Sequence, residues 1–399
     1  MRSRPYVAAM LSALVLTACG SSAEPPRPHG PTGSDAPTRE AGPKDPTGPA
    51  EPKLPTGPGS PTGPAERRAT RGDGAELMYR AGGRTSAQNP AFSPDGKSML
   101  FTLFHDGYNA GSAALRVLPP GADGPSARAA RGGSRKLLDE SGQAAVNLPG
   151  SSWHPAAGVT FASDRADRDE IWVLPPGGKP TRVTRHGGAS GYLEPSFSPR
   201  GDWIAFQESV EREEPAPSEA EDADPEDDGD EAEEEAAAAR PERSALGSLW
   251  KIRRDGSGQT RLLDGPATGT DNRQPNWSPR GDRLVFQRRE QHSDAWALYV
   301  VNADGGGLRR LTTGSGEHTD ATWSPDGRSV VFSSTSGGLE IPQVFVMSAD
   351  GGRPVRVTRN NSYDGAPSWS PDGRWIAFES HPGDEERPTS LWRIRVPGA

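Results

Sequence analysis

The chain has 399 residues, of which 49 are glycine and 41 are proline, and only 32% are hydrophobic. This composition is too rich in loop-forming residues for a helical protein and predicts many short strands beside unstructured stretches. The net charge of -9 is misleading, because fifteen carboxylates and one arginine lie between Glu211 and Glu235 and the rest of the chain carries +5. Since that remainder has no clustered basic stripe, we expect no nucleic-acid partner.

The first residues predict export and lipid attachment. Arg2 and Arg4 precede an apolar stretch that is too short to span a bilayer comfortably and ends in Leu-Thr-Ala-Cys at Cys19, the only cysteine. This tetrapeptide resembles the lipobox of bacterial lipoproteins, which implies a signal peptide over residues 1–18 and acyl chains, palmitate among them, on Cys19. The alternative is an ordinary secretory signal with a chance cysteine. Gly20 and Ser21 lack the aspartate that retains such lipoproteins in the inner membrane of Gram-negative cells, so in such a cell we expect a lipoprotein on the periplasmic face of the outer membrane.

Residues 19–75 are predicted to be a disordered linker. They are rich in Pro, Gly, Thr and Ser and include three copies of Pro-Thr-Gly-Pro, which start at Pro46, Pro55 and Pro61. Such a composition cannot bury a core, so the segment is interpreted as a flexible tether between the lipid anchor and the rest of the chain.

From residue 76 the sequence repeats. An aromatic residue ends a short strand, a Ser-Pro-Asp-Gly-like turn follows, and an alternating strand comes next, which together predict a hairpin. The six copies begin at Pro90, Trp153, Pro195, Pro275, Ala321 and Pro367, and the second is degenerate. Each hairpin is followed by a third strand, such as Leu298–Val301, and most by a fourth, such as Arg356–Thr358. Four strands per repeat predict an all-β, six-bladed propeller over residues 76–399.

Two further features complete this prediction. The last repeat lacks its outer strand, and Glu76–Arg80 matches that strand, so the N-terminal strand is expected to close the last blade and remove free sheet edges. The acidic segment, residues 208–245, interrupts the third repeat between its second and third strands and is expected to be a disordered loop. Within it, Asp224–Glu235 loosely fits an EF-hand loop but has Glu at position three, so weak cation binding stays an open alternative.

The repeats resemble the TolB-type, "WD40-like" propeller family of bacterial export compartments. The resemblance is carried by the Trp-Ser-Pro-Asp-Gly cores and by the stretch from Ser163 to Val173. It implies a binding scaffold for envelope proteins, such as a peptidoglycan-associated lipoprotein. TolB itself has an N-terminal α/β domain, where this sequence has the predicted anchor and tether. A named partner therefore does not follow from the resemblance.

No catalytic motif was found: Gly-x-Ser-x-Gly, His-Glu-x-x-His, a Walker loop and cysteine-based metal sites are absent from the sequence. We therefore expect a non-catalytic monomer without cofactor or metal, attached to a membrane through its lipid. The alternative is a metal-assisted hydrolase or lactonase with its site in the propeller channel.

The candidate binding site follows from topology. Residues just before the innermost strands should form a polar ring at one mouth of the channel, able to bind a peptide, glycan or cation; an equally open reading is that they only cap strands. The ring consists of Tyr192, Glu194, Asp271, Arg273, His318, Asp320, Tyr363 and Asp364. Trp277, Trp323 and Trp369 are expected to be core residues between blades, not ligand platforms.

Overall fold

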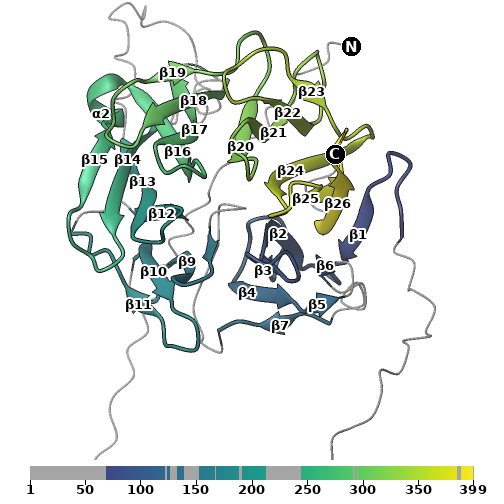
Figure 1. Cartoon of the computed structure of the whole chain (residues 1–399), viewed down its shortest axis with the longest axis horizontal. Helices are drawn as coiled ribbons and strands as arrows, with labels where there is room; N and C mark the ends of the chain where they lie inside the picture. Colours follow the sequence, from purple (N-terminus) through teal and green to yellow (C-terminus); the bar gives the residue numbers. More distant parts are fainter. Residues whose placement is uncertain are drawn as a thin grey trace, which may run out of the picture. The chain divides into compact units, whose positions relative to one another are not determined.

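The computed structural model describes residues 69–121, 124–125, 133–138, 152–166, 168–187, 191–212, 244–290, 293, 295–383 and 388–398. Six four-stranded antiparallel sheets stand around a common centre, and each sheet runs outward from its innermost strand (Figure 1). The prediction of an all-β, six-bladed propeller is confirmed. Among the described residues, no helix is long and apolar enough to cross a membrane.

The blades are numbered in chain order, and their strands are given from the centre outward. Blade 1 is β2 (Ser86–Phe92), β3 (Met99–Phe104), β4 (Ala113–Leu118) and β7 (Arg135–Lys136), and blade 2 is β8 (Trp153–His154), β9 (Gly158–Ser163), β10 (Glu170–Leu174) and β11 (Thr181–Arg182). Blade 3 is β12 (Gly191–Phe197), β13 (Trp203–Arg212), β14 (Ser244–Arg253) and β15 (Thr260–Leu263), and blade 4 is β16 (Thr270–Trp277), β17 (Arg283–Glu290), β18 (Ala297–Asn302) and β19 (Arg309–Arg310).

Blade 5 is β20 (His318–Trp323), β21 (Ser329–Ser334), β22 (Gln343–Ser348) and β23 (Val355–Arg356), and blade 6 is β24 (Ser362–Trp369), β25 (Trp375–Pro382), β26 (Ser390–Arg395) and β1 (Glu76–Tyr79). Two small elements lie outside the blades: the ribbon of β5 (Pro120–Gly121) and β6 (Gly124–Pro125), and the one-turn helix α2 (Gly265–Thr268).

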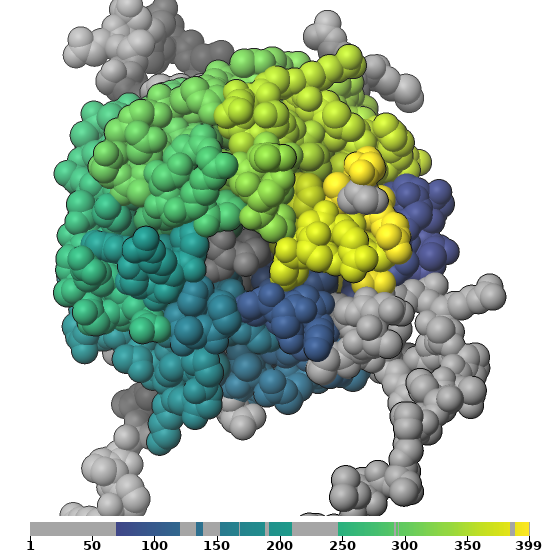
Figure 2. Space-filling model, viewed as in Figure 1, coloured from purple at the N-terminus to yellow at the C-terminus, as the bar shows by residue number. Residues whose placement is uncertain are grey.

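The N-terminal strand closes the last blade, as predicted. β1 pairs antiparallel with β26, and Leu77 lies opposite Trp392. In Figure 2 the purple N-terminal segment lies against the yellow C-terminal strands. The side chain of Arg393, which is 4% exposed, binds Glu76 at 2.7 Å. The two ends of the propeller are therefore joined by both backbone and side-chain contacts.

The propeller begins earlier than residue 76. Residues 69–75, which the sequence analysis assigned to the linker, turn back beside β1: the Leu77 N–H donates to the Ala69 carbonyl, and Ala75 is fully buried. Arg71 reaches Asp364 at 2.9 Å. This correction has a physical reason, since the residue that holds the segment lies almost 300 positions away in the sequence and no local pattern marks it.

The core lies between neighbouring blades. The second strand of every blade places one phenylalanine there with no exposed surface: Phe101, Phe161, Phe206, Phe286, Phe332 and Phe378. Burying one such side chain stabilises the fold by about 1.5–3 kcal/mol. The repeated alternation of the second strand therefore explains why the blades pack at regular intervals.

Blade 3 carries the acidic insert between its second and third strands, as predicted. Its bounds need correction, because residues 208–212 belong to β13 and 244–245 to β14, and the two strands stay paired from Trp203↔Arg253 to Arg212↔Ser244. Glu208 is held there by the indole of Trp250 at 2.8 Å. Residues 213–243, with the EF-hand-like stretch, lie outside the described residues, as do residues 1–68 with Cys19 and the three Pro-Thr-Gly-Pro copies.

Candidate functional site

The predicted ring residues lie within the innermost strands β12, β16, β20 and β24, and not before them. These strands begin several residues ahead of the conspicuous aromatic turn, which is why sequence inspection placed the ring outside them. Seven of the eight side chains are buried, and Arg273 is the exception. They therefore do not form a solvated rim.

Most ring residues are engaged in separate contacts. Asp271 pairs with Arg273 at 2.8 Å, and Asp364 pairs with Arg71 and accepts a 2.7 Å hydrogen bond from Asn360. His318 Nδ1 contacts the Ser334 hydroxyl at 2.9 Å, while burial and the charge of Arg310 lower the pKa of His318 to about 4.

The two tyrosines of the ring lie apart from each other. Tyr192 accepts a 3.0 Å hydrogen bond from Gln259, and Tyr363 stacks on His381 with ring centroids 4.8 Å apart. The first contact lies within blade 3 and the second within blade 6.

Glu194 and Asp320 belong to a feature that sequence inspection missed. Five innermost strands contain a bulge, and each places a non-glycine residue in the left-handed conformation three positions before its terminal aromatic: Asn89, Glu194, Gln274, Asp320 and Ala366, with φ between 44° and 57°. Such a conformation costs energy in a non-glycine residue and persists when surrounding contacts hold it. Here those contacts come from a neighbouring blade.

The bulges are linked across blades by hydrogen bonds. Glu194 accepts from the backbone N–H of Gln274 at 2.9 Å, and Gln274 accepts from that of Asp320 at 3.2 Å. Asp320 in turn accepts from the N–H of Ala366, and Glu379 of β25 accepts from that of Asn89 at 2.8 Å. We call Glu194, Gln274, Asp320 and Glu379 the channel belt.

Burial governs the charge of the channel belt. Burial, with a smaller contribution from the carboxyl of Asp320, raises the pKa of both Glu194 and Glu379 to about 8. Tyr108 donates to Glu379 at 3.1 Å and contacts the Tyr363 hydroxyl at 3.2 Å. At neutral pH the two glutamates therefore hold protons, and each member of the channel belt accepts a hydrogen bond from a backbone N–H.

The Ser-Pro turns form the opposite end of the innermost strands. In each of the five turns the serine hydroxyl donates to an aspartate of the same turn at 2.5–2.8 Å and accepts from the N–H that opens the next strand. The serine bonds hold the pKa of Asp95, Asp282 and Asp326 below the usual range. In degenerate blade 2 the ring of His154 replaces this arrangement and accepts from the N–H groups of Ala156 and Ala157.

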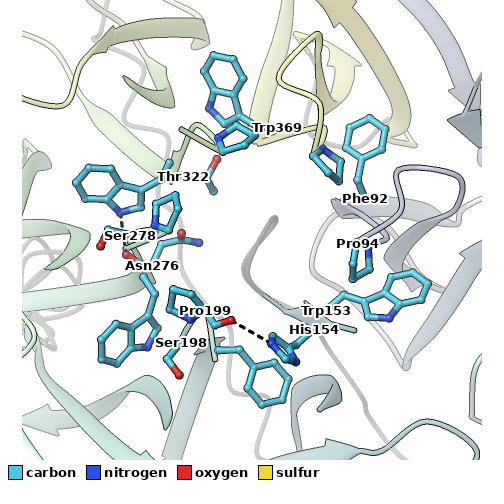
Figure 3. Close-up of a pocket in the computed structure, with 16 residues that line it drawn as sticks. Phe92, Pro94, Trp153, His154, Ser198, Pro199, Asn276, Ser278, Thr322 and Trp369 are labelled. Atoms are coloured by element: carbon cyan, nitrogen blue, oxygen red, sulfur yellow. Dashed lines mark hydrogen bonds between the residues drawn. The ribbon is translucent and has the colours of Figure 1, made fainter. Parts of the chain in front are cut away.

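These turns surround an open pocket of about 220 Å³, which we call the turn mouth (Figure 3). Pro94 and Pro199 lie nearer its centre than the rings of Phe92, Trp153 and Trp369. Bonds between blades fix the wall: the Trp323 indole donates to the Asn276 carbonyl at 3.0 Å, and His154 Nε2 contacts the Pro199 carbonyl at 3.1 Å. The lining aromatics and prolines are Phe92, Pro94, Trp153, Phe197, Pro199, Trp277, Pro279, Trp323, Pro325, Trp369 and Pro371.

The tryptophans predicted to be core residues have a double role. Trp277 and Trp323 are 5% and 6% exposed and pack between blades, as expected, yet they also line the turn mouth behind the prolines. The signal for this site was present in the sequence as the proline that recurs after each Ser. The sequence analysis interpreted this proline only as a residue that favours a turn.

Part of the repeat region is similar to a known protein family. Residues 259–389 match the family model of the TolB beta propeller domain. The repeats over residues 259–389 are therefore similar to those of the TolB beta propeller domain. No curated protein matches the chain.

Solved structures with a similar arrangement include three proteins. A protein assigned as TolB from Agrobacterium tumefaciens is 20% identical, with a TM-score of 0.49 and coverage of 78% of this chain and 90% of its own. An oligogalacturonate lyase in complex with manganese is 15% identical, with a TM-score of 0.48 and coverage of 83% and 95%. A puromycin-hydrolyzing peptidase from Mycobacterium tuberculosis is 16% identical, with a TM-score of 0.48 and coverage of 75% and 44%.

Among the described residues, no three His, Cys, Asp or Glu side chains lie close enough together to hold a metal ion. The channel-belt carboxyls are instead spread over blades 3, 5 and 6 and bound to backbone N–H groups. None of them lines the turn mouth. The chemistry that this arrangement supports is hydrogen bonding between blades.

Proposed function

We propose that this protein is a non-catalytic scaffold that binds a partner protein at the turn mouth. The observation that carries this proposal is the open, proline- and aromatic-lined pocket of about 220 Å³ at the end of the channel. Aromatic side chains are enriched at the centre of surfaces that bind other proteins. The polar groups of the channel belt, by contrast, are already satisfied within the propeller.

The setting that we propose for this scaffold is the cell envelope. The sequence at Cys19 resembles a lipobox, so the mature chain would be held by acyl chains on the periplasmic face of the outer membrane. The linker that follows would let the propeller reach proteins away from the bilayer, such as a peptidoglycan-associated protein. This part of the proposal rests on sequence alone, because residues 1–68 lie outside the described residues.

Affinity capture of the full-length lipoprotein from membranes tests the binding site. Pro325→Arg with Pro371→Arg places two charges in the turn mouth, at turn positions that accept most residues. The double variant should lose the partner, whereas Val355→Arg should retain it, because Val355 is 56% exposed on the outer strand of blade 5. Equal recovery of the same partner by both variants would overturn the turn mouth as the site.

A further inference from the structure

The five Ser-Pro turns are of two kinds. In blades 1, 5 and 6 the aspartate is the third turn residue and a cation is the fifth: Asp95 and Lys97, Asp326 and Arg328, Asp372 and Arg374. In blades 3 and 4 the order is reversed, with Arg200 before Asp202 and Arg280 before Asp282. The serine hydroxyl reaches the aspartate in both kinds, at 2.5–2.6 Å and at 2.7–2.8 Å. The turn therefore folds with either order of aspartate and cation. The order decides which position on the protein surface carries the positive charge.

The reversed order in blades 3 and 4 places two arginines beside one cavity, which we call the groove. A cavity of about 540 Å³ lies between the turns of blades 3 and 4, and Arg200 and Arg280 both line it. Its apolar wall includes Trp203, Pro199 and Pro279. The one acidic residue among those that line it is Asp202, whose carboxylate is held by Ser198 at 2.8 Å. The groove is continuous with the turn mouth, because Pro199 and Pro279 line both.

The residues that line the groove carry an excess of positive charge. Arg200 and Arg280 are exposed, and neither guanidinium makes a hydrogen bond or ion pair with any described residue. The ammonium of Lys251, which donates to the Ala303 carbonyl at 2.6 Å, lies 5.1 Å from the centre of the Trp203 ring, and the guanidinium of Arg253 lies 4.5 Å from it. An aromatic wall below free guanidinium groups is complementary to a ligand with both carboxylates and apolar side chains.

We propose that this groove between blades 3 and 4 binds an acidic peptide segment of the partner protein. Its carboxylates would pair with Arg200 and Arg280, and an apolar side chain between them would pack on Trp203. Paired guanidinium and carboxylate groups form two parallel hydrogen bonds, which fix both affinity and orientation. The proposal deepens the proposed function and rests on it, since it names the chemistry of the segment that enters beside the turn mouth.

The test measures binding of a fluorescein-labelled peptide of alternating glutamate and leucine to the full-length protein. Its glutamine counterpart is the uncharged probe, and inorganic phosphate is the competing anion. Arg280→Asp with Asp282→Arg gives blade 4 the turn of blades 5 and 6 without changing net charge, and moves the positive charge from a position that lines the groove to one that does not. We expect this variant to bind the glutamate peptide about tenfold more weakly or worse.

The matched control makes the opposite exchange in blade 5, Asp326→Arg with Arg328→Asp, and should keep the affinity unchanged. Three results would each contradict the acidic-peptide site. They are an unchanged affinity in the blade 4 variant, equal binding of the glutamine peptide, and full competition by millimolar phosphate. If neither peptide binds while the unaltered protein still captures its partner, this inference fails and the proposed scaffold function stands.

Discussion

Five bulge residues of different chemistry, from Ala366 to Glu194, share one left-handed conformation. In four of them, Asn89, Gln274, Asp320 and Ala366, the backbone N–H donates to a side chain of the neighbouring blade. Sequence inspection found Glu194 and Asp320 but missed Gln274 and Glu379. The bulge recurs as a backbone conformation with a different residue type in each blade, and Glu379 lies on the second strand instead of the bulge. Likewise, Asp364 was read as a rim residue because its partner Arg71 is remote in sequence. Side-chain roles set by contacts between blades were thus not predictable from one repeat.

Replacing the channel-belt glutamates should stabilise the protein. The pKa of Glu194 and Glu379 is about 8 in the fold against 4.5 for a free glutamate, so the native state retains protons that the unfolded chain releases. Stability from these groups is present below pH 4.5 and is lost as the pH rises towards 8. Glu194→Gln and Glu379→Gln should each raise the free energy of unfolding by about 1–3 kcal/mol at pH 8 and by little at pH 4.5.

Urea unfolding at several pH values measures this effect. Glu340→Gln is the control, because Glu340 is exposed, and its effect should not vary with pH. A gain that is the same at pH 4.5 and pH 8, or a loss at pH 8, would contradict the assignment of buried, protonated glutamates.

At the scale of elements, β1 and the residues before it hold the ring closed. Leu77, Met78 and Tyr79 are buried on β1, and Ala75 is buried between blades 5 and 6. The closing strand was predictable from sequence, because the last repeat lacked one strand and Glu76–Arg80 supplied it. The stretch from residue 69 was not, because it has no repeat pattern.

Deleting residues 69–79 should open the ring. The loss of four buried apolar side chains and of the pairing with β26 should lower the melting temperature by about 10 °C or more and expose a sheet edge that promotes association. Calorimetry and light scattering measure both effects. Deleting residues 24–60 as the control should leave the melting temperature unchanged, and an equally stable 69–79 deletion would show that β1 does not close the propeller.

At the scale of the whole molecule, the repeat of one aromatic and one turn per blade was enough to predict the fold. The evenly spaced Trp277, Trp323 and Trp369 located blades 4 to 6, and the longer interval before Trp277 located the insert in blade 3. The binding surface was not predictable in the same way. Whether a turn proline faces a pocket depends on how the six blades converge. The sequence of a single repeat does not determine that arrangement.

The proposed attachment of the whole molecule depends on Cys19. Cys19→Ala should move the protein from the membrane fraction to the soluble fraction of the envelope, because acyl chains supply the proposed anchoring energy. Fractionation followed by immunoblotting measures this, with mass analysis of the N-terminal peptide of the unaltered protein. An unaltered protein that lacks acyl chains would contradict the lipoprotein assignment and support a secretory signal with a chance cysteine.

The most direct test of the central claim is the amount of partner recovered by quantitative capture from membranes with the Pro325→Arg, Pro371→Arg variant and with Val355→Arg. If the propeller binds its partner at the turn mouth, recovery should fall to background in the first and stay at the level of the unaltered protein in the second. Equal recovery in both would show that the mouth is not the binding site.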